Sequence, residues 1–371
     1  MEHKMKVIDL FAGCGGFSVG FEKAGYDIVK AVEFDKEIAS SYCHNHPRTI
    51  MFADDIGRIV DDEHFKKGEA DIIIGGPPCQ GFSMAGARIR EKNAFMNDPR
   101  NYLFRHYVNV VGIVRPKIFV FENVKGILSK DQGKIFQEIE TAFGNPDNFN
   151  GDKYYLHYKV CRAVEYGIAQ RRERVILIGL LNHDFDIEHV FEEAKAKIKI
   201  AKPHFFDSIT LHDAISDIPA PSKDGIIKLG KPQTLYQESI RDGQNITFNH
   251  IASKHNELAI GRMNKVLAGQ NWTVLDEKIK SVHSGAYGRL VWNSPTMTIT
   301  TRFDTPAGGR YIHPDDNRTL TPREAARVQS FPDSFEFIGS KSSICKQIGN
   351  AVPPKLAYFL ANVVNLLLCE Q

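Results

Sequence analysis

A buried strand that stops at a rigid turn is the feature that most constrains this chain. Residues 70–74, Ala-Asp-Ile-Ile-Ile, form a short apolar, β-branched run, which is typical of a strand buried on both faces. Two glycines and two prolines follow, in the stretch Gly75-Gly-Pro-Pro-Cys-Gln-Gly-Phe-Ser83. Since proline fixes φ and donates no backbone hydrogen bond, the strand ends there and the turn is stiff. The turn presents Cys79 at the carboxyl end of the strand, where open α/β sheets bind their ligands.

Cys79 is therefore a candidate nucleophile, with Gln80 and Ser83 in the loop beyond it. The alternative is a small hydrophobic residue packed in a turn, and the neighbouring residues alone leave the two interpretations about even. The six cysteines are scattered and lack metal-site spacing, so we expect no metal site. Reduced thiols in a cytoplasmic protein fit this cysteine usage best.

The first 35 residues predict a nucleotide-binding unit. A strand at Lys6–Leu10 runs into the glycine-rich turn Phe11-Ala-Gly-Cys-Gly-Gly16, a helix follows, and a second strand ends at Glu33. A carboxylate after the second strand is placed to accept hydrogen bonds from ribose hydroxyls. The glycine spacing differs from G-x-G-x-x-G, which argues against a dinucleotide. It favours a nucleoside without phosphate, such as S-adenosylmethionine.

Strands and helices continue to alternate to about residue 180. A third strand ends in acids, of which Asp54 or Asp55 either meets an adenine amino group or caps a helix. The fifth strand, Ile118–Val124, is apolar until Glu122, whose carboxylate we expect in the same crevice as Cys79. The alternative is a structural carboxylate that caps the next turn. The alternation predicts an α/β fold, a doubly wound sheet of the Rossmann-like kind.

Length and composition suggest a second domain. The chain has 371 residues, more than one hydrophobic core usually holds. From about residue 201 to 320 it is turn-rich with little periodicity, and the net charge of only +2 gives no global basic field. The apolar C-terminal helix must pack on the first domain. We therefore predict a catalytic domain of residues 1–185 plus 335–371, and a second domain with a hinge at 186–334. No apolar run approaches a membrane span.

Several motifs occur together in one order: Asp9-Leu-Phe-Ala-Gly-Cys-Gly-Gly16, Gly76-Pro-Pro-Cys-Gln-Gly-Phe-Ser83, Glu122-Asn-Val124, Gln170-Arg-Arg-Glu-Arg174, Leu320-Thr-Pro-Arg-Glu-Ala-Ala-Arg327 and Gln347-Ile-Gly-Asn-Ala-Val-Pro-Pro354. In this combination the chain resembles the cytosine-C5 DNA methyltransferase family, of the bacterial restriction-modification type. The resemblance implies a Rossmann-like, S-adenosylmethionine-dependent catalytic domain. It also implies a smaller, irregular target-recognition domain, in which residues of about 190–286 read the DNA sequence.

The resemblance also implies roles for individual residues. Cys79 would attack cytosine C6, Glu122 would bind at N3, and Arg172, nearest the reacting groups, would assist with Arg174. The cofactor would be S-adenosylmethionine, with Glu33 on its ribose, Phe34 on its adenine and Asp55 with Ile56 at the adenine edge. The remaining implied cofactor residues are Phe11, Ala12, Gly13, Gly15, Gly76, Pro78, Leu103, Asn350, Ala351 and Val352. The implied DNA contacts are Gln80, Ser83, Arg289 and Thr298.

We expect a monomeric, cytoplasmic protein that acts on double-stranded DNA and protects it from a cognate restriction endonuclease. Two alternatives within the family are a tRNA cytosine-C5 methyltransferase and an inactive regulatory relative. The Gln-Gly-Phe-Ser sequence after Cys79 argues against the first, and the intact set of Cys79, Glu122 and arginines argues against the second. A nicotinamide dehydrogenase would share the fold but leaves the Pro-Pro-Cys turn unexplained.

Overall fold

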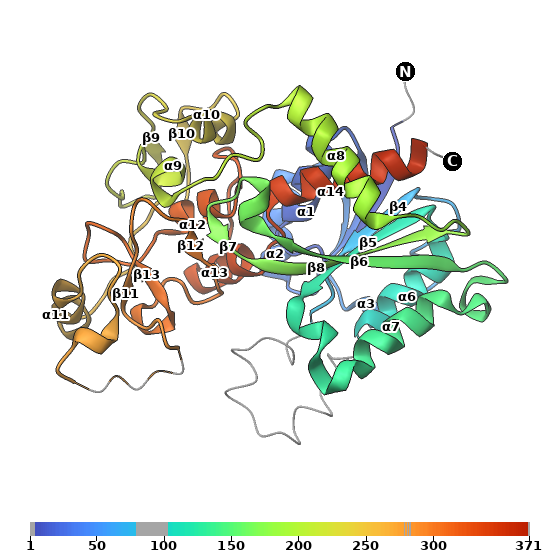
Figure 1. Cartoon of the computed structure of the whole chain (residues 1–371), viewed down its shortest axis with the longest axis horizontal. Helices are drawn as coiled ribbons and strands as arrows, with labels where there is room; N and C mark the ends of the chain where they lie inside the picture. The colour runs from blue at the N-terminus through green and yellow to red at the C-terminus, as the bar shows by residue number, and fades with distance from the viewer. Residues whose placement is uncertain (1–3, 79–102, 278, 280, 282, 370–371) are drawn as a thin grey trace. The chain divides into compact units, whose positions relative to one another are not determined.

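The structure, a computed structural model, describes residues 4–78, 103–277, 279, 281 and 283–369. The chain forms two compact units. Unit 1 comprises residues 1–162, 173–203 and 356–371, and unit 2 comprises residues 163–172 and 204–355. Figure 1 labels most of the elements of both units.

Unit 1 is built on a seven-stranded sheet in the order β3-β2-β1-β4-β5-β8-β6. The first five strands in this order pair in parallel, whereas β8 is antiparallel to both β5 and β6. The strands are β1 (Lys6–Leu10), β2 (Asp27–Val32), β3 (Ile50–Phe52), β4 (Ile72–Gly75), β5 (Ile118–Val124), β6 (Tyr154–Arg162) and β8 (Glu173–Leu181). The predicted α/β, Rossmann-like sheet is thereby confirmed.

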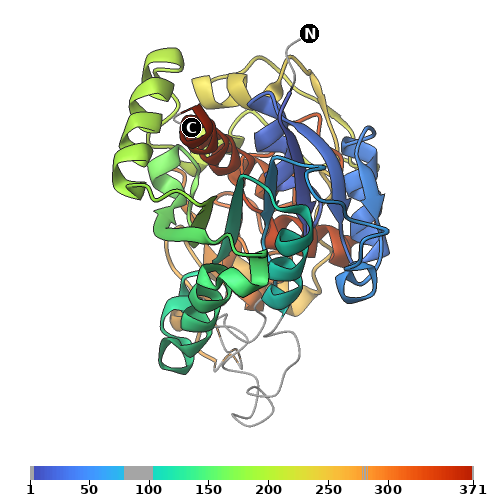
Figure 2. The same ribbon diagram turned by 90° about the vertical axis from the view of Figure 1, so that its right-hand side faces the viewer.

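Helices cover both faces of this sheet, because its central strands are apolar on both sides (Figures 1 and 2). On one face, Phe119 and Phe121 of β5 pack against Tyr107 of α6 and, in the case of Phe119, Phe143 of α7. On the other, α8 and α14 meet through Phe191 and Phe359, whose ring centroids are 5.3 Å apart. The helices of unit 1 are α1 (Gly16–Lys23), α2 (Lys36–Asn45), α3 (Ile56–Ile59), α6 (Leu103–Val114), α7 (Lys134–Gly144), α8 (Ile187–Ala201) and α14 (Pro354–Cys369), the last from residue 356 on.

Unit 2 has little regular structure, as the turn-rich composition predicts. Its helices are short, and its strands, of two or three residues, pair two by two. The helices are α9 (Leu211–Ile215), α10 (Leu235–Arg241), α11 (Glu257–Lys265), α12 (Pro322–Val328) and α13 (Lys341–Asn350). The strands are β7 (Gln170–Arg171), β9 (Ile227–Lys228), β10 (Ile246–Thr247), β11 (Gly288–Arg289), β12 (Thr296–Met297) and β13 (Arg310–Ile312).

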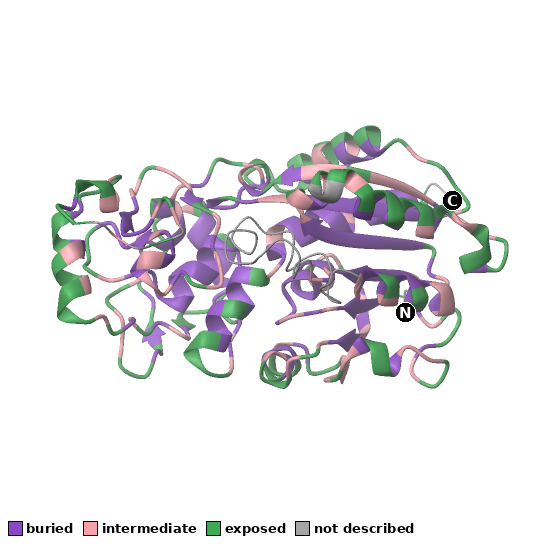
Figure 3. Cartoon of the chain, turned by 90° about the horizontal axis from the view of Figure 1, so that it is seen from below, coloured by how far each residue is buried: buried purple, intermediate pink, exposed green. Residues whose placement is uncertain are grey.

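All seven residues of α12 are buried, including the charged ones (Figure 3). Arg327 donates two hydrogen bonds, of 2.8 and 2.7 Å, to the two carboxylate oxygens of Asp333. It also pairs with Asp217, which in turn accepts a hydrogen bond from Arg241. Thus two carboxylates and two guanidinium groups neutralise one another inside unit 2, where an unpaired charge would be costly.

The two compact units have other bounds than the predicted domains, whose assignment stays a prediction. The charged segment after residue 186 is α8, whose apolar side packs in unit 1. Residues 335–355 belong to unit 2, because α13 packs closely there. A side chain at Gly349 would come within 2.5 Å of the Thr300 backbone. Residues 163–172 join unit 2 because β7 pairs with β12.

Replacing Arg327 with methionine is expected to destabilise the protein strongly. The substitution keeps an unbranched side chain but leaves Asp217 and Asp333 buried without their shared cation. Breaking a buried ion pair in this way costs about 3–5 kcal/mol. Guanidinium chloride unfolding measures the loss, with Arg302→Met at an exposed position as the matched control. Equal unfolding midpoints for the two variants would show that the network contributes little.

Candidate functional site

The turn between β1 and α1 has an unusual, largely left-handed backbone. Phe11, Gly13 and Gly15 have φ of 57°, 56° and 97°, so three of five successive residues adopt left-handed backbone conformations. The turn is held from β2 by two hydrogen bonds. Ala12 N donates to the Val32 carbonyl at 2.9 Å, and Gly13 N donates to Glu33 Oε2 at 2.9 Å.

The two glycines of this turn have different surroundings. A Cβ built on Gly13 would have no atom within 4 Å, so the turn is open there. A Cβ on Gly15 would lie 2.3 Å from His46 Nε2. His46 is buried, stacks on Tyr42 and lies 2.8 Å through Nδ1 from Glu22. Gly13 therefore leaves room for a ligand, whereas Gly15 lets the turn pack against α2.

Glu33 has each carboxylate oxygen bound by one backbone N–H, from Gly13 and from Asp35, both at 2.9 Å. Burial raises the pKa of Glu33, and these hydrogen bonds oppose the shift. A carboxylate oxygen accepts more than one hydrogen bond, so capacity remains for ribose hydroxyls. Phe34 beside it is 71% exposed, which leaves its ring free for stacking. These residues fit the nucleoside part of S-adenosylmethionine.

Asp55 caps α3, because its side chain accepts a hydrogen bond of 2.9 Å from Gly57 N. One of the two roles considered for this acid is thus observed, and its contact with adenine stays a prediction. Ile56 is buried, with 4% of its surface exposed. Leu103, the first residue of α6, is partly buried.

The turn after β4 is anchored by β5. Asn123 Nδ2 donates a hydrogen bond of 3.1 Å to the Pro77 carbonyl, and a Cβ on Gly76 would lie 3.0 Å from Glu122 Oε2. Pro78 is the last described residue before the nucleophile candidate. Cys79, Gln80 and Ser83 lie outside the described residues, so their predicted roles stay predictions.

Glu122 forms an ion pair with Arg174, with Nε and Oε1 2.7 Å apart. Both side chains are largely buried, at 10% and 15% exposure. The antiparallel register pairs Glu122 with Ile176 and Val124 with Arg174. Glu122 and Arg174 are therefore diagonal neighbours on one face of the sheet, close enough for long side chains to meet.

Arg172 belongs to unit 2. Its buried guanidinium donates hydrogen bonds to the carbonyls of Gly349 and Ala351, each at 3.0 Å, and to Ile299 at 3.4 Å. Arg174 is thus the arginine that contacts Glu122, and the position of Arg172 nearest the reacting groups stays a prediction. Arg172 instead holds the segment that carries three predicted cofactor residues, of which Asn350 is exposed, Ala351 partly buried and Val352 buried.

Arg289 does not have the exposed position expected of a DNA contact. It is 6% exposed, and its hydrogen bonds go to five carbonyls, four of them at 2.7–2.8 Å and one at 3.4 Å, and to Asn317 Oδ1 at 2.6 Å. These hydrogen bonds stabilise the fold of unit 2, and the DNA contact of Arg289 stays a prediction. Thr298 is partly buried and donates to the Arg171 carbonyl at 3.0 Å, and its DNA contact stays a prediction.

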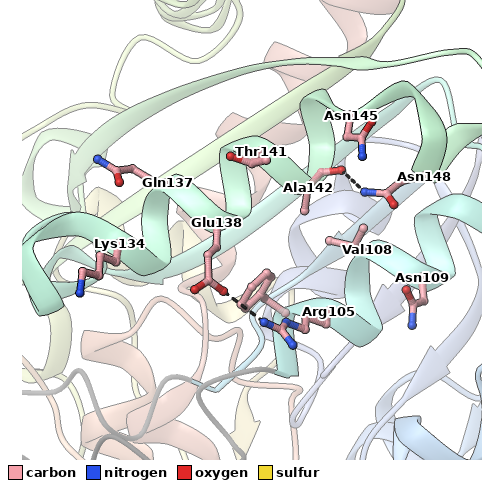
Figure 4. A pocket seen from close by; sticks show the side chains of 11 residues that line it. Arg105, Val108, Asn109, Lys134, Gln137, Glu138, Thr141, Ala142, Asn145 and Asn148 are labelled. Carbon is pink, nitrogen blue, oxygen red and sulfur yellow. Dashed lines mark hydrogen bonds and ion pairs between the residues drawn. The ribbon is translucent and has the colours of Figure 1, made fainter.

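A groove of about 670 Å³ lies between α6 and α7 (Figure 4). An ion pair of 3.3 Å between Arg105 and Glu138 crosses it, and none of the predicted site residues lines it. Within the described residues, no group of three or more His, Cys, Asp or Glu side chains could hold a metal ion.

Two residues that support the turns were not predicted from the sequence, Asn123 at the turn after β4 and His46 at the glycine turn. Asn123 stands inside the Glu-Asn-Val motif, whereas no local pattern marks His46.

Two glycine substitutions should separate ligand binding from folding. Gly13→Ala places a methyl group in open space, so we expect a small loss of stability, about 1–2 kcal/mol from the left-handed φ, and a large loss of cofactor affinity. Gly15→Ala adds a collision with His46, so its melting temperature should fall well below that of Gly13→Ala. Calorimetry and thermal melts measure both effects. Equal melting temperatures for the two variants would refute the assignment of Gly13 to ligand binding and of Gly15 to packing.

Comparison with known proteins agrees with this geometry. The family description "C-5 cytosine-specific DNA methylase" matches residues 5–365. The chain is 34% identical to the Type II methyltransferase M.DdeI of Desulfomicrobium norvegicum, over 97% of this chain and 88% of that one. It is 32% identical to the Type II methyltransferase M1.HphI of Haemophilus parahaemolyticus, over 96% and 86%. A crystal structure of a putative DNA modification methyltransferase encoded within an E. coli prophage superposes with a TM-score of 0.75, at 28% identity over 99% of this chain and 100% of that one. With the glycine turn, the Pro-Pro turn and the Glu122–Arg174 pair in place, the chain belongs to the C-5 cytosine-specific DNA methylase family.

Proposed function

We propose that this protein transfers a methyl group from S-adenosylmethionine to C5 of cytosine in a specific duplex DNA sequence. The observation that carries the proposal is the arrangement at one edge of the sheet of unit 1. The parallel strands β1, β4 and β5 end there with the glycine turn, the Gly76-Pro-Pro turn and Glu122. Because β8 runs antiparallel to β5, it begins at the same edge and delivers Arg174 to Glu122.

In the proposed chemistry, two side chains act directly on the cytosine, Cys79 and Glu122. The Cys79 thiolate attacks C6 of cytosine, forming a carbon–sulfur bond and making C5 an enamine carbon. Glu122 binds at N3 and shares a proton there, which stabilises the electron-rich ring. S-adenosylmethionine supplies an electrophilic methyl group, which C5 attacks. Loss of the C5 proton then lets the carbon–sulfur bond break, which frees Cys79.

Arg174 and Asn123 position these groups. The Arg174 guanidinium, 2.7 Å from Glu122, holds the carboxylate at one place on the sheet edge. Asn123 fixes the Pro77 carbonyl, two residues before the nucleophile. An error of about 1 Å in such a geometry costs up to about a hundredfold in rate, so both contacts matter for catalysis.

Most of the residues that we infer to bind the cofactor lie at the same edge of the sheet. We infer that the methionine end lies over Phe11, Ala12, Gly13 and Gly15 and that Glu33 binds the ribose. The open space at Gly13 and the exposed Phe34 ring support this. Gly76, Pro78, Leu103, Asp55 and Ile56, with Asn350, Ala351 and Val352 of unit 2, complete the inferred set.

Unit 2 is the inferred reader of DNA sequence, since turn-rich loops on a scaffold commonly carry binding function. The target cytosine must leave the base stack, which costs a few kcal/mol. We propose a cognate restriction endonuclease as functional partner, a monomeric state and a cytoplasmic location. Within the described residues, one helical stretch, Lys341–Cys369, is apolar and long enough to cross a membrane, but 67% of its most apolar 18-residue window is buried. This is expected of core helices in a soluble protein.

Methyl transfer from tritiated S-adenosylmethionine to duplex DNA tests the function. We expect labelled cytosine in DNA and none in tRNA, and no transfer by Cys79→Ser, which replaces the thiolate with a poor nucleophile. The variant should bind the cofactor as the parent chain does. Labelling of tRNA instead of DNA would favour the related RNA enzymes. Turnover by Cys79→Ser within tenfold of the parent would exclude Cys79 as the nucleophile.

A double-mutant cycle tests which of the two arginines acts with Glu122. Glu122→Gln should lower the methylation rate by about 10²–10⁴-fold, because an amide cannot share a proton with N3. Arg174→Met should also lower it, and its effect should largely disappear in the Glu122→Gln background, since the two groups act as a pair. Arg172→Met is the control, and its effect should add to that of Glu122→Gln. Coupling of Glu122 to Arg172 rather than to Arg174 would show that Arg172 is the arginine that acts with Glu122.

A further inference from the structure

A second carboxylate, that of Asp9, lies close before the glycine turn of residues 11–16, which is called the cofactor turn below because it is proposed to hold S-adenosylmethionine. The proposed chemistry does not use this carboxylate. Asp9, on β1, is 1% exposed. Its Oδ2 accepts a hydrogen bond of 2.6 Å from Ser18 Oγ, in the first turn of α1. Ser18 Oγ lies 2.8 Å from the Tyr42 hydroxyl of α2. Asp9 thus links the two elements that flank the glycine turn, and through Ser18 it also reaches α2.

The other oxygen of Asp9 is buried and, among the described residues, has no hydrogen-bond partner. Burial raises the pKa of Tyr42 well above its usual value, so the phenol keeps its proton. The donors therefore run from Tyr42 to Ser18 to Asp9, and a single neutral donor serves the carboxylate. Such a group is costly to ionise in a dry site.

Other charged and titratable groups around Asp9 add to this cost. Burial raises the pKa of Asp9 to about 7, the Ser18 hydrogen bond opposes the shift, and the charges of Glu33 and Glu22 add to it. Burial also raises the pKa of Cys14 in the turn to about 12, so its thiol stays neutral. From α2, Tyr42 and the Glu22-bound His46 complete the surroundings. The two charges that raise the pKa of Asp9 further are thus both carboxylates, Glu33 and Glu22.

A ligand that brings positive charge to this turn would change the balance. The methionine end of S-adenosylmethionine carries a sulfonium and an ammonium cation, whereas the thioether of the demethylated product carries no charge. A nearby cation favours the ionised form of a buried carboxyl group. By linkage, the ionised group then favours the cation.

We propose that Asp9 is a proton-linked positioning residue of the cofactor turn, which ionises when S-adenosylmethionine binds and thereby favours the cationic methyl donor over the product. The inference rests on the proposed cofactor site. It explains why a carboxylate with an unpartnered oxygen is kept beneath a turn whose backbone shape depends on the elements that Asp9 joins. Asp9 touches no reacting atom and acts through the electrostatics of the turn.

Isothermal titration calorimetry with S-adenosylmethionine and S-adenosylhomocysteine between pH 6 and pH 8 tests the proposal. Both ligands carry the same amino and carboxylate groups, so the ratio of their affinities isolates the sulfonium charge. With an Asp9 pKa of about 7 in the free protein, that ratio should rise about tenfold over this range. Buffers of different ionisation enthalpy should show that binding of the methyl donor releases a proton.

Asp9→Asn should flatten the pH dependence of the ratio and abolish the proton release, while Asp27→Asn, at the opposite end of β2, should change neither. The apo protein gives a second readout. Because the folded-state pKa of Asp9 is raised from 3.8 to about 7, its contribution to stability is lost as pH rises through this interval. Asp9→Asn should therefore melt at a higher temperature, relative to the parent, at pH 8 than at pH 5.

Ser18→Ala keeps the carboxylate but removes its donor, so it should move the midpoint of the affinity ratio to higher pH. This variant keeps the proposal testable if Asp9→Asn folds poorly. A ratio independent of pH in the parent chain, or one unchanged in Asp9→Asn, would overturn the role of Asp9 and leave the methyltransferase proposal standing. Failure of the parent chain to bind either ligand would overturn both.

Discussion

The reversed direction of β8 is the constraint on which the candidate site depends. In a purely parallel sheet every strand would bring only its carboxyl end to the ligand edge. Because β8 is antiparallel to β5, its first residues reach that edge, and Arg174 meets Glu122 on the same face at 2.7 Å. A largely buried carboxylate without this cation would be costly to keep charged. The charged state of Glu122 at the ligand edge thus depends on the sheet topology, because the antiparallel strand β8 supplies its cation.

Arginine has a second use in this protein, which is to hold irregular backbone together. Arg172, Arg289 and Arg323 are buried in unit 2 and donate mainly to backbone carbonyls. Loops of this kind leave carbonyl groups that no strand or helix satisfies, and a guanidinium with five donors can serve several at once. This is why a motif rich in arginine does not by itself indicate contact with nucleic acid.

Much of the fold and part of the site could be predicted locally. The β-branched run before Gly75, the apolar run before Glu122 and the acid after β2 each mark a strand end, because strand burial and termination depend on neighbouring residues. The pairing of Glu122 with Arg174 rather than with Arg172 could not be predicted in this way. The two residues are two positions apart in one motif, yet pairing partners far along the chain place them in different units.

The sequence by itself determined the sheet, the two turns at its ligand edge and membership of the family, since these rest on hydrophobic periodicity, on glycine and proline, and on ordered motifs. Only the tertiary structure decided that Arg174 pairs with Glu122, that Arg289 is buried and that Asp9 lies beneath the cofactor turn. The physical reason is that a side chain's charge partners and burial come from segments remote in sequence. Local patterns specify how a strand forms and ends, but not what packs against its side chains.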